Sequence, residues 1–244
     1  MFFFDPMYFL FMIPPLIFML YAQAKVNSTF KKYSAVANSQ RLTGVAAAER
    51  LLRANGLANV KVEMVEGRLG DHYDPTKKVL RLSSGVANSA SVAALGVVAH
   101  EVGHAVQDKT GYAFMKFRTS FVPAANLGST LGYILVILGI IIYAFSRLEF
   151  GFSIALFGVL LFSLAVIFSL ITLPVEYNAS SRARQMLQST GLVSVQELGS
   201  HPSGIGPALL LGICAAGHAR QELNPLLLLF IVSPPLVDSA SLTV

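Results

Sequence analysis

Residues 91–109, with the sequence SVAALGVVAHEVGHAVQDK, decide how this 244-residue chain is organised. They contain the pattern His100-Glu101-x-x-His104 in a run that favours a helix, and Ser91 can cap its first turn. Positions four apart lie one above the other on the same face of a helix, so His100 and His104 can bind one ion. Glu101 would then lie beside that ion.

The residue types in this pattern are those of a catalytic zinc site. Such a site needs three protein ligands and an open position for water, and zinc prefers neutral imidazole nitrogen. The ion acidifies the water, and a carboxylate next to the first histidine takes its proton. The pattern therefore predicts Zn²⁺ as cofactor, His100 and His104 as ligands and Glu101 as general base. The alternative is a helix with merely hydrogen-bonded or exposed histidines, which the apolar neighbours disfavour. Gly103, between the ligands, predicts the close approach of another element.

The composition predicts a membrane protein. Hydrophobic residues make up 54% of the chain and charged residues only 13%, against about 25% in an ordinary soluble domain. The single cysteine, Cys214, excludes an internal disulfide and a cysteine-rich zinc site, and it fits a reducing compartment.

Three apolar stretches are long enough to cross a bilayer. We expect residues 1–21 to form an N-terminal transmembrane anchor, because the start MFFFD lacks the basic region of a signal peptide. Residues 119–173 are expected to form a transmembrane hairpin with its turn at residues 146–149. Its second arm returns the chain to the membrane face where the first arm began.

The segment between anchor and hairpin, residues 22–118, is expected to fold outside the bilayer as a small α+β domain. Residues 43–55 are predicted to form a helix. Residues 60–65 and 78–83 alternate in the manner of strands. Between them, residues 70–75 are predicted to be a polar loop that ends at a proline.

Basic residues predict the orientation of the chain in the plasma membrane. They gather after the first span, before the second and after the third, whereas the hairpin turn has Arg147 alone. By the positive-inside rule, the domain that carries the histidines faces the cytoplasm. Anionic membrane lipid then accounts for the net charge of +5, and we expect no nucleic-acid partner.

The third zinc ligand has several candidates by residue type: His72, Asp74, Asp108, Glu176 and His201. Glu176 is favoured, because the hairpin returns it to the membrane face on which His100 is expected. An alternative for Glu176 is an interfacial ion pair with Arg182 or Arg184. Asp108 is expected to be a solvated residue at the end of its helix.

Three motifs together, DHYDP (71–75), HEVGHA (100–105) and PVEYNAS (174–180), carry a family resemblance. Over residues 1–197 the chain resembles the YugP-type neutral zinc metallopeptidases of bacterial membranes. More distantly it resembles gluzincin membrane proteases of the HtpX and CAAX-processing kinds. The resemblance implies a zincin-like domain, polypeptide substrates that include membrane proteins, and the zinc ligands His100, His104 and Glu176, with Glu101 as general base.

The resemblance also implies roles for residues around the site. In the distant relatives an acidic residue four positions after the third ligand supports the site, and here Ser180 stands there. A strand edge before the zinc helix often binds substrate by β-addition, which implies substrate contacts from Val79, Leu80, Arg81 and Leu82. A second donor to the oxyanion is expected from His72, with Tyr73, Tyr177 and Arg182 as alternatives.

Residues 174–197 are expected to form the helix that carries the third ligand, and residues 198–244 form an atypical hydrophobic tail. The two apolar pieces of the tail, 207–219 and 226–237, are short for a membrane span. A change of reading frame near Leu198 is one explanation, and a re-entrant or interfacial end is the other. His201 and His218 receive no role.

The sequence thus predicts an α-helical membrane protein with about three transmembrane helices and zinc peptidase activity. A different reading is a scaffold or adaptor that keeps a structural metal site, but such a site has no need of Glu101. A transporter is disfavoured, because the spans lack the intramembrane charges that mark ion and substrate pathways.

Overall fold

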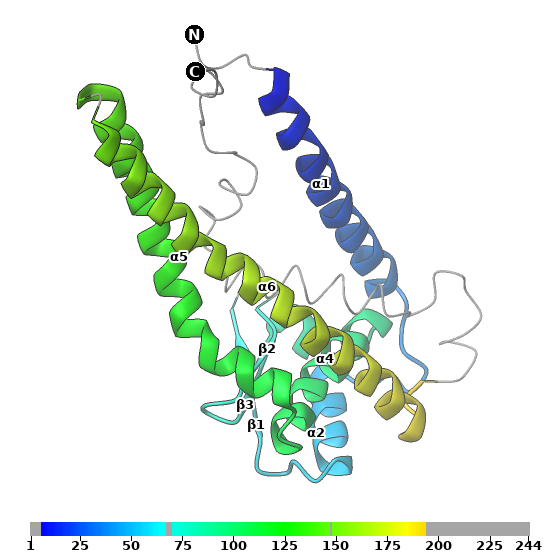
Figure 1. Ribbon diagram of the computed structural model, residues 1–244. Coiled ribbons are helices and arrows are strands. Elements are labelled where there is room, and N and C mark those ends of the chain that lie inside the picture. Colours follow the sequence, from blue (N-terminus) through cyan, green and yellow to red (C-terminus); the bar gives the residue numbers. More distant parts are fainter. Residues whose placement is uncertain (1–5, 67–69, 147, 194–244) are drawn as a thin grey trace.

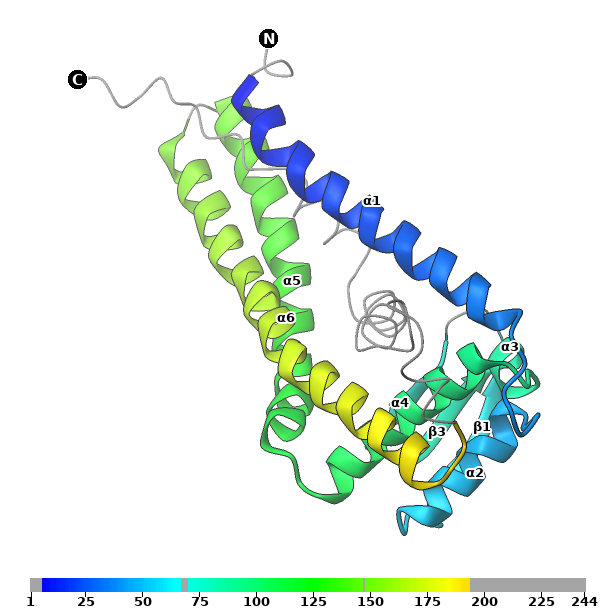
Figure 2. The same ribbon diagram turned by 90° about the vertical axis from the view of Figure 1, so that its right-hand side faces the viewer.

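The computed structural model describes residues 6–66, 70–146 and 148–193. Three long helices extend from one side of a small compact unit, residues 44–109, as both views in Figures 1 and 2 show. The elements in chain order are α1 (Pro6–Ser34), α2 (Gly44–Ala54), β1 (Lys61–Val65), β2 (His72–Asp74), β3 (Val79–Ser83), α3 (Ser84–Ala87), α4 (Val92–Lys109), α5 (Ala113–Ser146) and α6 (Glu149–Ser189).

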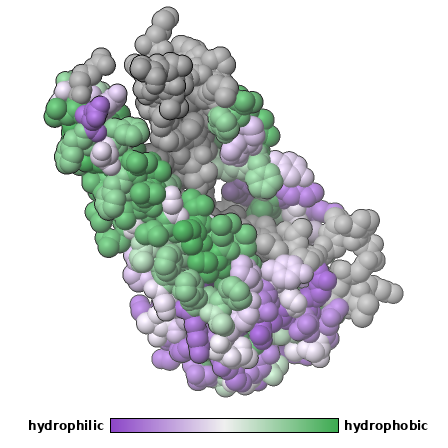
Figure 3. All heavy atoms as spheres, viewed as in Figure 1, coloured by the Kyte–Doolittle hydropathy of each residue, from purple (hydrophilic) through white to green (hydrophobic). Residues whose placement is uncertain are grey.

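Within the described residues, the helical parts Phe9–Ser34, Ala113–Ser146 and Glu149–Ser189 are long and apolar enough to cross a membrane. In the view of Figure 3, hydrophobic side chains cover most of the α5–α6 hairpin, and hydrophilic ones gather over the compact unit. α1 continues past residue 21, the predicted end of the anchor. Its last turns remain helical because Val26, Phe30 and Tyr33 pack against the core of the compact unit.

α5 and α6 form the predicted hairpin and pack closely through glycines. A Cβ on Gly132 would lie 2.7 Å from the carbonyl oxygen of Gly158, so the backbones touch where no side chain intervenes. α6 continues through Pro174 to Ser189. The apolar second arm of the hairpin and the helix that carries Glu176 are therefore a single element.

The sheet has the order β1-β3-β2, with β1 parallel and β2 antiparallel to β3. β1 and β3 confirm the two predicted strands. The prediction that residues 70–75 form only a loop is wrong at its centre, because His72–Asp74 pairs with β3. This strand is too short and polar to be recognised locally, and its pairing depends on a partner distant in sequence.

The position of β3 contradicts the prediction that it offers an open edge to substrate. It is the middle strand, so both of its edges already pair with neighbouring strands. Val79, Leu80 and Leu82 are buried in the core, and Arg81 contacts Glu63 and Asp74. The four residues of the predicted substrate cradle, Val79, Leu80, Arg81 and Leu82, therefore cannot receive a peptide by β-addition in this structure.

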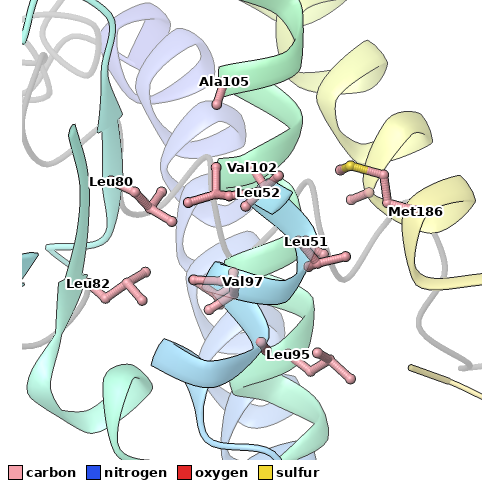
Figure 4. Packing of buried hydrophobic residues seen from close by; sticks show 14 of the residues in the cluster. Leu51, Leu52, Leu80, Leu82, Leu95, Val97, Val102, Ala105 and Met186 are labelled. Atoms are coloured by element: carbon pink, nitrogen blue, oxygen red, sulfur yellow. The ribbon is translucent and has the colours of Figure 1, made fainter. Parts of the chain in front are cut away.

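The core of the compact unit surrounds α4, which is buried along almost its whole length. The predicted helices at 43–55 and 91–109 are confirmed, and the Ser91 hydroxyl caps α4 by accepting a hydrogen bond from the amide of Ala94 at 3.2 Å. Figure 4 shows side chains of α2, β3 and α4 meeting in this core: Leu51, Leu52, Leu80, Leu82, Leu95, Val97, Val102 and Ala105.

Candidate metal centre

His100, His104 and Glu176 come together where α4 crosses α6. Their possible ligand atoms all lie within 4.8 Å of one another, and all three side chains are buried. Glu176 Oε2 lies 3.0 Å from His100 Nε2 and 3.5 Å from His104 Nε2. Two imidazoles and one carboxylate aimed at a common point form a donor set that suits zinc.

The close crossing of α4 and α6 depends on Gly103. A Cβ at this position would lie 2.6 Å from the carbonyl oxygen of Ala179, far inside ordinary contact distance. The predicted close approach at Gly103 is thus confirmed. Because Ala179 stands one helical turn after Glu176, this contact brings the carboxylate over the two histidines.

Gln107 is fully buried and orients His104 through a hydrogen-bond network. Its Nε2 donates to the carbonyl oxygen of Val175 at 2.8 Å and to Asn178 Oδ1 at 3.0 Å. Its Oε1 must therefore accept, and it lies 2.9 Å from His104 Nδ1. The proton of His104 is placed on Nδ1 by this network, so Nε2 is the nitrogen that can bind a metal.

Ser180 occupies the corresponding position beside His100. Its hydroxyl oxygen lies 3.1 Å from His100 Nδ1 and is buried with it. The hydroxyl oxygen can accept a hydrogen bond from Nδ1–H, which leaves Nε2 facing Glu176. Ser180, which stands where the distant relatives have an acidic residue, therefore still gives His100 a hydrogen-bond partner but adds no charge.

Glu101 is buried beside the three potential ligands. The backbone N–H of Tyr73, on β2, donates to Glu101 Oε2 at 3.1 Å. Burial raises the pKa of Glu101 to about 8 in the absence of a metal ion. A carboxyl group whose pKa lies near neutral pH is suited to accept a proton and to return it.

The two histidines differ in their electrostatic surroundings. Burial lowers the pKa of His100 below its ordinary value, because the charged imidazolium loses its hydration. Burial also disfavours the charged form of His104, but the carboxylates of Glu176 and Glu101 together outweigh this effect and raise the pKa of His104. Glu176 therefore favours the protonated form of His104, which competes with metal binding.

Arg118 on α5 is a further buried residue at the centre, and the sequence reasoning missed its role. Its Nη1 lies 3.9 Å from Glu176 Oε1. In the sequence it stood among basic residues near a membrane end, with no local signal of burial. The alternative partner predicted for Glu176, Arg182, instead donates from Nε to Asn178 Oδ1 at 2.8 Å.

The other predicted candidates lie outside the group of three. His72 has its Nδ1 2.8 Å from the carbonyl oxygen of Gly70 and its Nε2 3.2 Å from Arg81 Nη1. Asp74 accepts a hydrogen bond from Arg81, and Tyr177 is mostly exposed. His201 lies outside the described residues.

Asp108 is also separate from the group of three, but it is not the solvated end residue that we predicted. Its Oδ2 accepts a hydrogen bond from the Tyr73 hydroxyl at 2.7 Å and pairs with the ammonium of Lys78. Asp108 thereby joins α4 to the sheet.

Fold and site together define a protein with helices of membrane length and a buried centre that could hold a metal ion. The chain belongs to the family described as "Putative neutral zinc metallopeptidase", which matches residues 8–224. It is also 40% identical over 211 residues to "Putative membrane protease YugP" of Bacillus subtilis (strain 168). That alignment covers 86% of this chain and 91% of the relative. No solved structure matches the chain.

The comparisons confirm the family resemblance predicted from the three motifs. The family match also extends beyond residue 198 into the tail, whose structure lies outside the described residues. The family name indicates zinc, in agreement with the donor set of the buried centre.

Proposed function

We propose that this chain is a membrane-embedded zinc metallopeptidase that hydrolyses peptide bonds of polypeptides, membrane proteins among them. His100, His104 and Glu176 would hold the zinc ion, and Glu101 would be the general base. The observation that carries the proposal is that the possible ligand atoms of these three residues lie within 4.8 Å of one another, beside the buried carboxylate of Glu101. Membership of the family and the name of the Bacillus relative support it.

A bound zinc ion would polarise the scissile carbonyl and acidify a water molecule. Glu101 takes a proton from that water as its oxygen bonds to the carbonyl carbon. Glu101 then gives the proton to the nitrogen as the carbon–nitrogen bond breaks, so one water is added across the peptide bond. Gln107 and Ser180 keep the two imidazoles in the tautomer that presents Nε2.

A second donor to the carbonyl oxygen is still required. His72 stays a prediction for this role, and its ring lies against Arg81 and the carbonyl of Gly70 in this structure. Arg118 is a second candidate, because its guanidinium is buried within 3.9 Å of Glu176.

We further propose that the compact unit faces the cytoplasm and that the three long helices cross the plasma membrane. The basic residues at the ends of the apolar helices support this orientation, since such residues favour the cytoplasmic face and its anionic lipid.

The decisive experiment separates a peptidase from a scaffold that keeps a structural metal. Full-length chain and Glu101→Gln would be purified in detergent, analysed for zinc and assayed with dye-labelled casein. We expect about one zinc per chain in both, with hydrolysis in the wild type alone. Glu49→Gln, an exposed residue paired with Arg53, makes the same chemical change and should retain activity. Zinc without casein hydrolysis in the wild type would favour the scaffold.

A further inference from the structure

Two carboxylates on one face of α4 contact the same residue of β2. Glu101 and Asp108 are seven positions apart, about two turns of helix or 10 Å along the axis. The backbone N–H of Tyr73 donates to Glu101, and the Tyr73 hydroxyl donates to Asp108 at 2.7 Å. A single residue thus spans two turns of the zinc helix and fixes β2 against it.

Lys78 adds a second connection to Asp108 from the other end of the β2–β3 turn. Its ammonium pairs with Asp108 Oδ2, and its φ of 54° lies in the left-handed region that side chains other than glycine seldom adopt. The turn is shaped by Asp74 Oδ1, which accepts the amides of Thr76 and Lys77, each at 3.0 Å. This turn directs Lys78 toward Asp108.

We propose that Tyr73, Lys78 and Asp108, here called the Asp108 clamp, position the carboxylate of Glu101 for proton transfer. The inference rests on the proposed function and adds to it a set of positioning residues. The Tyr73 amide fixes the rotation of the Glu101 carboxylate by holding one of its oxygens. A reacting group must be held within about 0.5 Å of its productive position.

The position of that amide depends on the side-chain anchor. β2 has only three residues and pairs with β3 on one side, so its own ladder holds it weakly. The Tyr73 side chain is 6% exposed, and its hydroxyl ends on Asp108. Loss of this anchor lets β2 move away from α4, and the amide moves with it, although no group at the metal centre has changed.

The test uses Tyr73→Phe and Asp108→Asn in the full-length, detergent-purified chain. Both substitutions nearly preserve side-chain shape. Tyr112→Phe is the matched control, because Tyr112 follows the end of α4 and its ring contacts Phe114 instead of Asp108. The measurements are zinc content, melting temperature, kcat and KM on dye-labelled casein, and amide hydrogen exchange of peptides that contain Tyr73.

We expect kcat to fall about tenfold in Tyr73→Phe and in Asp108→Asn, the size expected for loss of one hydrogen bond to a charged group. KM should change by less than about twofold and zinc content should not change, because substrate and metal contacts remain. Exchange of the Tyr73 peptide should quicken by a similar factor, while Tyr112→Phe matches the wild type. The double variant should lose little more than either single one.

Three results would overturn the proposal. They are an unchanged kcat in both variants, unchanged exchange in the Tyr73 peptide, and loss of zinc with a large fall in melting temperature, which would indicate a purely structural contact. If the wild type binds zinc but does not cleave casein, the proposed function fails separately. Hydrogen exchange then tests the clamp without any activity assay. Glu101→Ala should speed exchange in the Tyr73 peptide, and adding Asp108→Asn to Glu101→Ala should not speed it further. An additive increase in the double variant would contradict the clamp.

Discussion

At the scale of single residues, the two histidines of the centre are oriented by neutral side chains. Gln107 accepts from His104, and Ser180 lies within hydrogen-bond distance of His100. A neutral partner fixes the tautomer and the ring orientation without adding a third carboxylate to a site that already contains Glu101 and Glu176. Gln107 is the more constrained of the two, because its amide nitrogen also bonds to α6.

Replacement of Gln107 by leucine should weaken zinc binding by about 10- to 100-fold, because His104 loses the partner that holds its tautomer. The measurement is a zinc titration in competition with a chromophoric chelator. Gln188→Leu, at an exposed position of α6, is the control and should bind zinc as the wild type does. Equal affinities for both variants would contradict the orienting role of Gln107.

Zinc affinity should fall as the pH is lowered. The Glu176 carboxylate raises the pKa of His104 against the opposing effect of burial, so His104 retains its proton over a wider pH range. Zinc binds only the neutral imidazole and must displace that proton, which costs about tenfold in affinity for each pH unit below the pKa. Calorimetry in buffers of different ionisation enthalpy would detect the released proton. A flat affinity between about pH 5.5 and 8 would contradict this coupling.

At the scale of elements, the metal centre is a property of the contact between α4 and α6. Neither helix carries a complete ligand set, since α4 supplies two histidines and α6 supplies the carboxylate. Their spacing is set by backbone contact at Gly103 and Ala179. A change in this spacing moves Glu176 relative to both histidines, whereas His100 and His104 keep their own relation within one helix.

Gly103→Ala should therefore weaken zinc binding and destabilise the chain by about 1–3 kcal/mol, as overpacking does elsewhere. The new Cβ would stand 2.6 Å from the Ala179 carbonyl oxygen, and backbone cannot yield as a flexible side chain can. Gly85→Ala in α3 is the matched control, because a Cβ there meets nothing within 4 Å. Chelator competition and thermal unfolding provide the two readouts. Wild-type values in Gly103→Ala would show that the helices are not held by this contact.

At the scale of the whole molecule, the candidate metal centre lies at the compact unit of the described chain, and the apolar surface lies on three long helices. The buried centre lies where the apolar hairpin meets the compact unit, because α6 runs from one into the other. Such an arrangement would place the site near the membrane surface, within reach of membrane-protein substrates.

The proposed orientation predicts a labelling pattern in intact cells. With Cys214 replaced by serine, Ser146→Cys at the end of α5 should react with a membrane-impermeant maleimide from outside. Asn88→Cys in the compact unit should react only after the cells are permeabilised. Both positions are exposed in the structure. The reverse pattern would contradict the cytoplasmic orientation of the compact unit.

Much of the fold follows from local patterns. Apolar length predicts α5 and α6, and a run of residues that favour a helix, preceded by the cap Ser91, predicts α4. The predicted end of the first helix, residue 21, is too early, and the strand β2 was predicted to be part of a loop. In both cases packing or pairing with a distant segment overrides a polar local sequence.

The sequence alone predicts two of the metal ligands, the candidate general base and the helix that carries them, because a spacing of four residues has a fixed meaning within one helix. The family motifs pointed to Glu176. The packing of α4 against its neighbours places Gln107, Ser180 and Arg118 around the centre, and it brings the amide of Tyr73 to Glu101. The contacts of Tyr73, Arg118 and Ser180 join residues 28 to 80 positions apart, and no local periodicity encodes which distant side chains a packed core brings together. Gln107 stands only three positions after His104, but its own partners on α6 are distant in sequence.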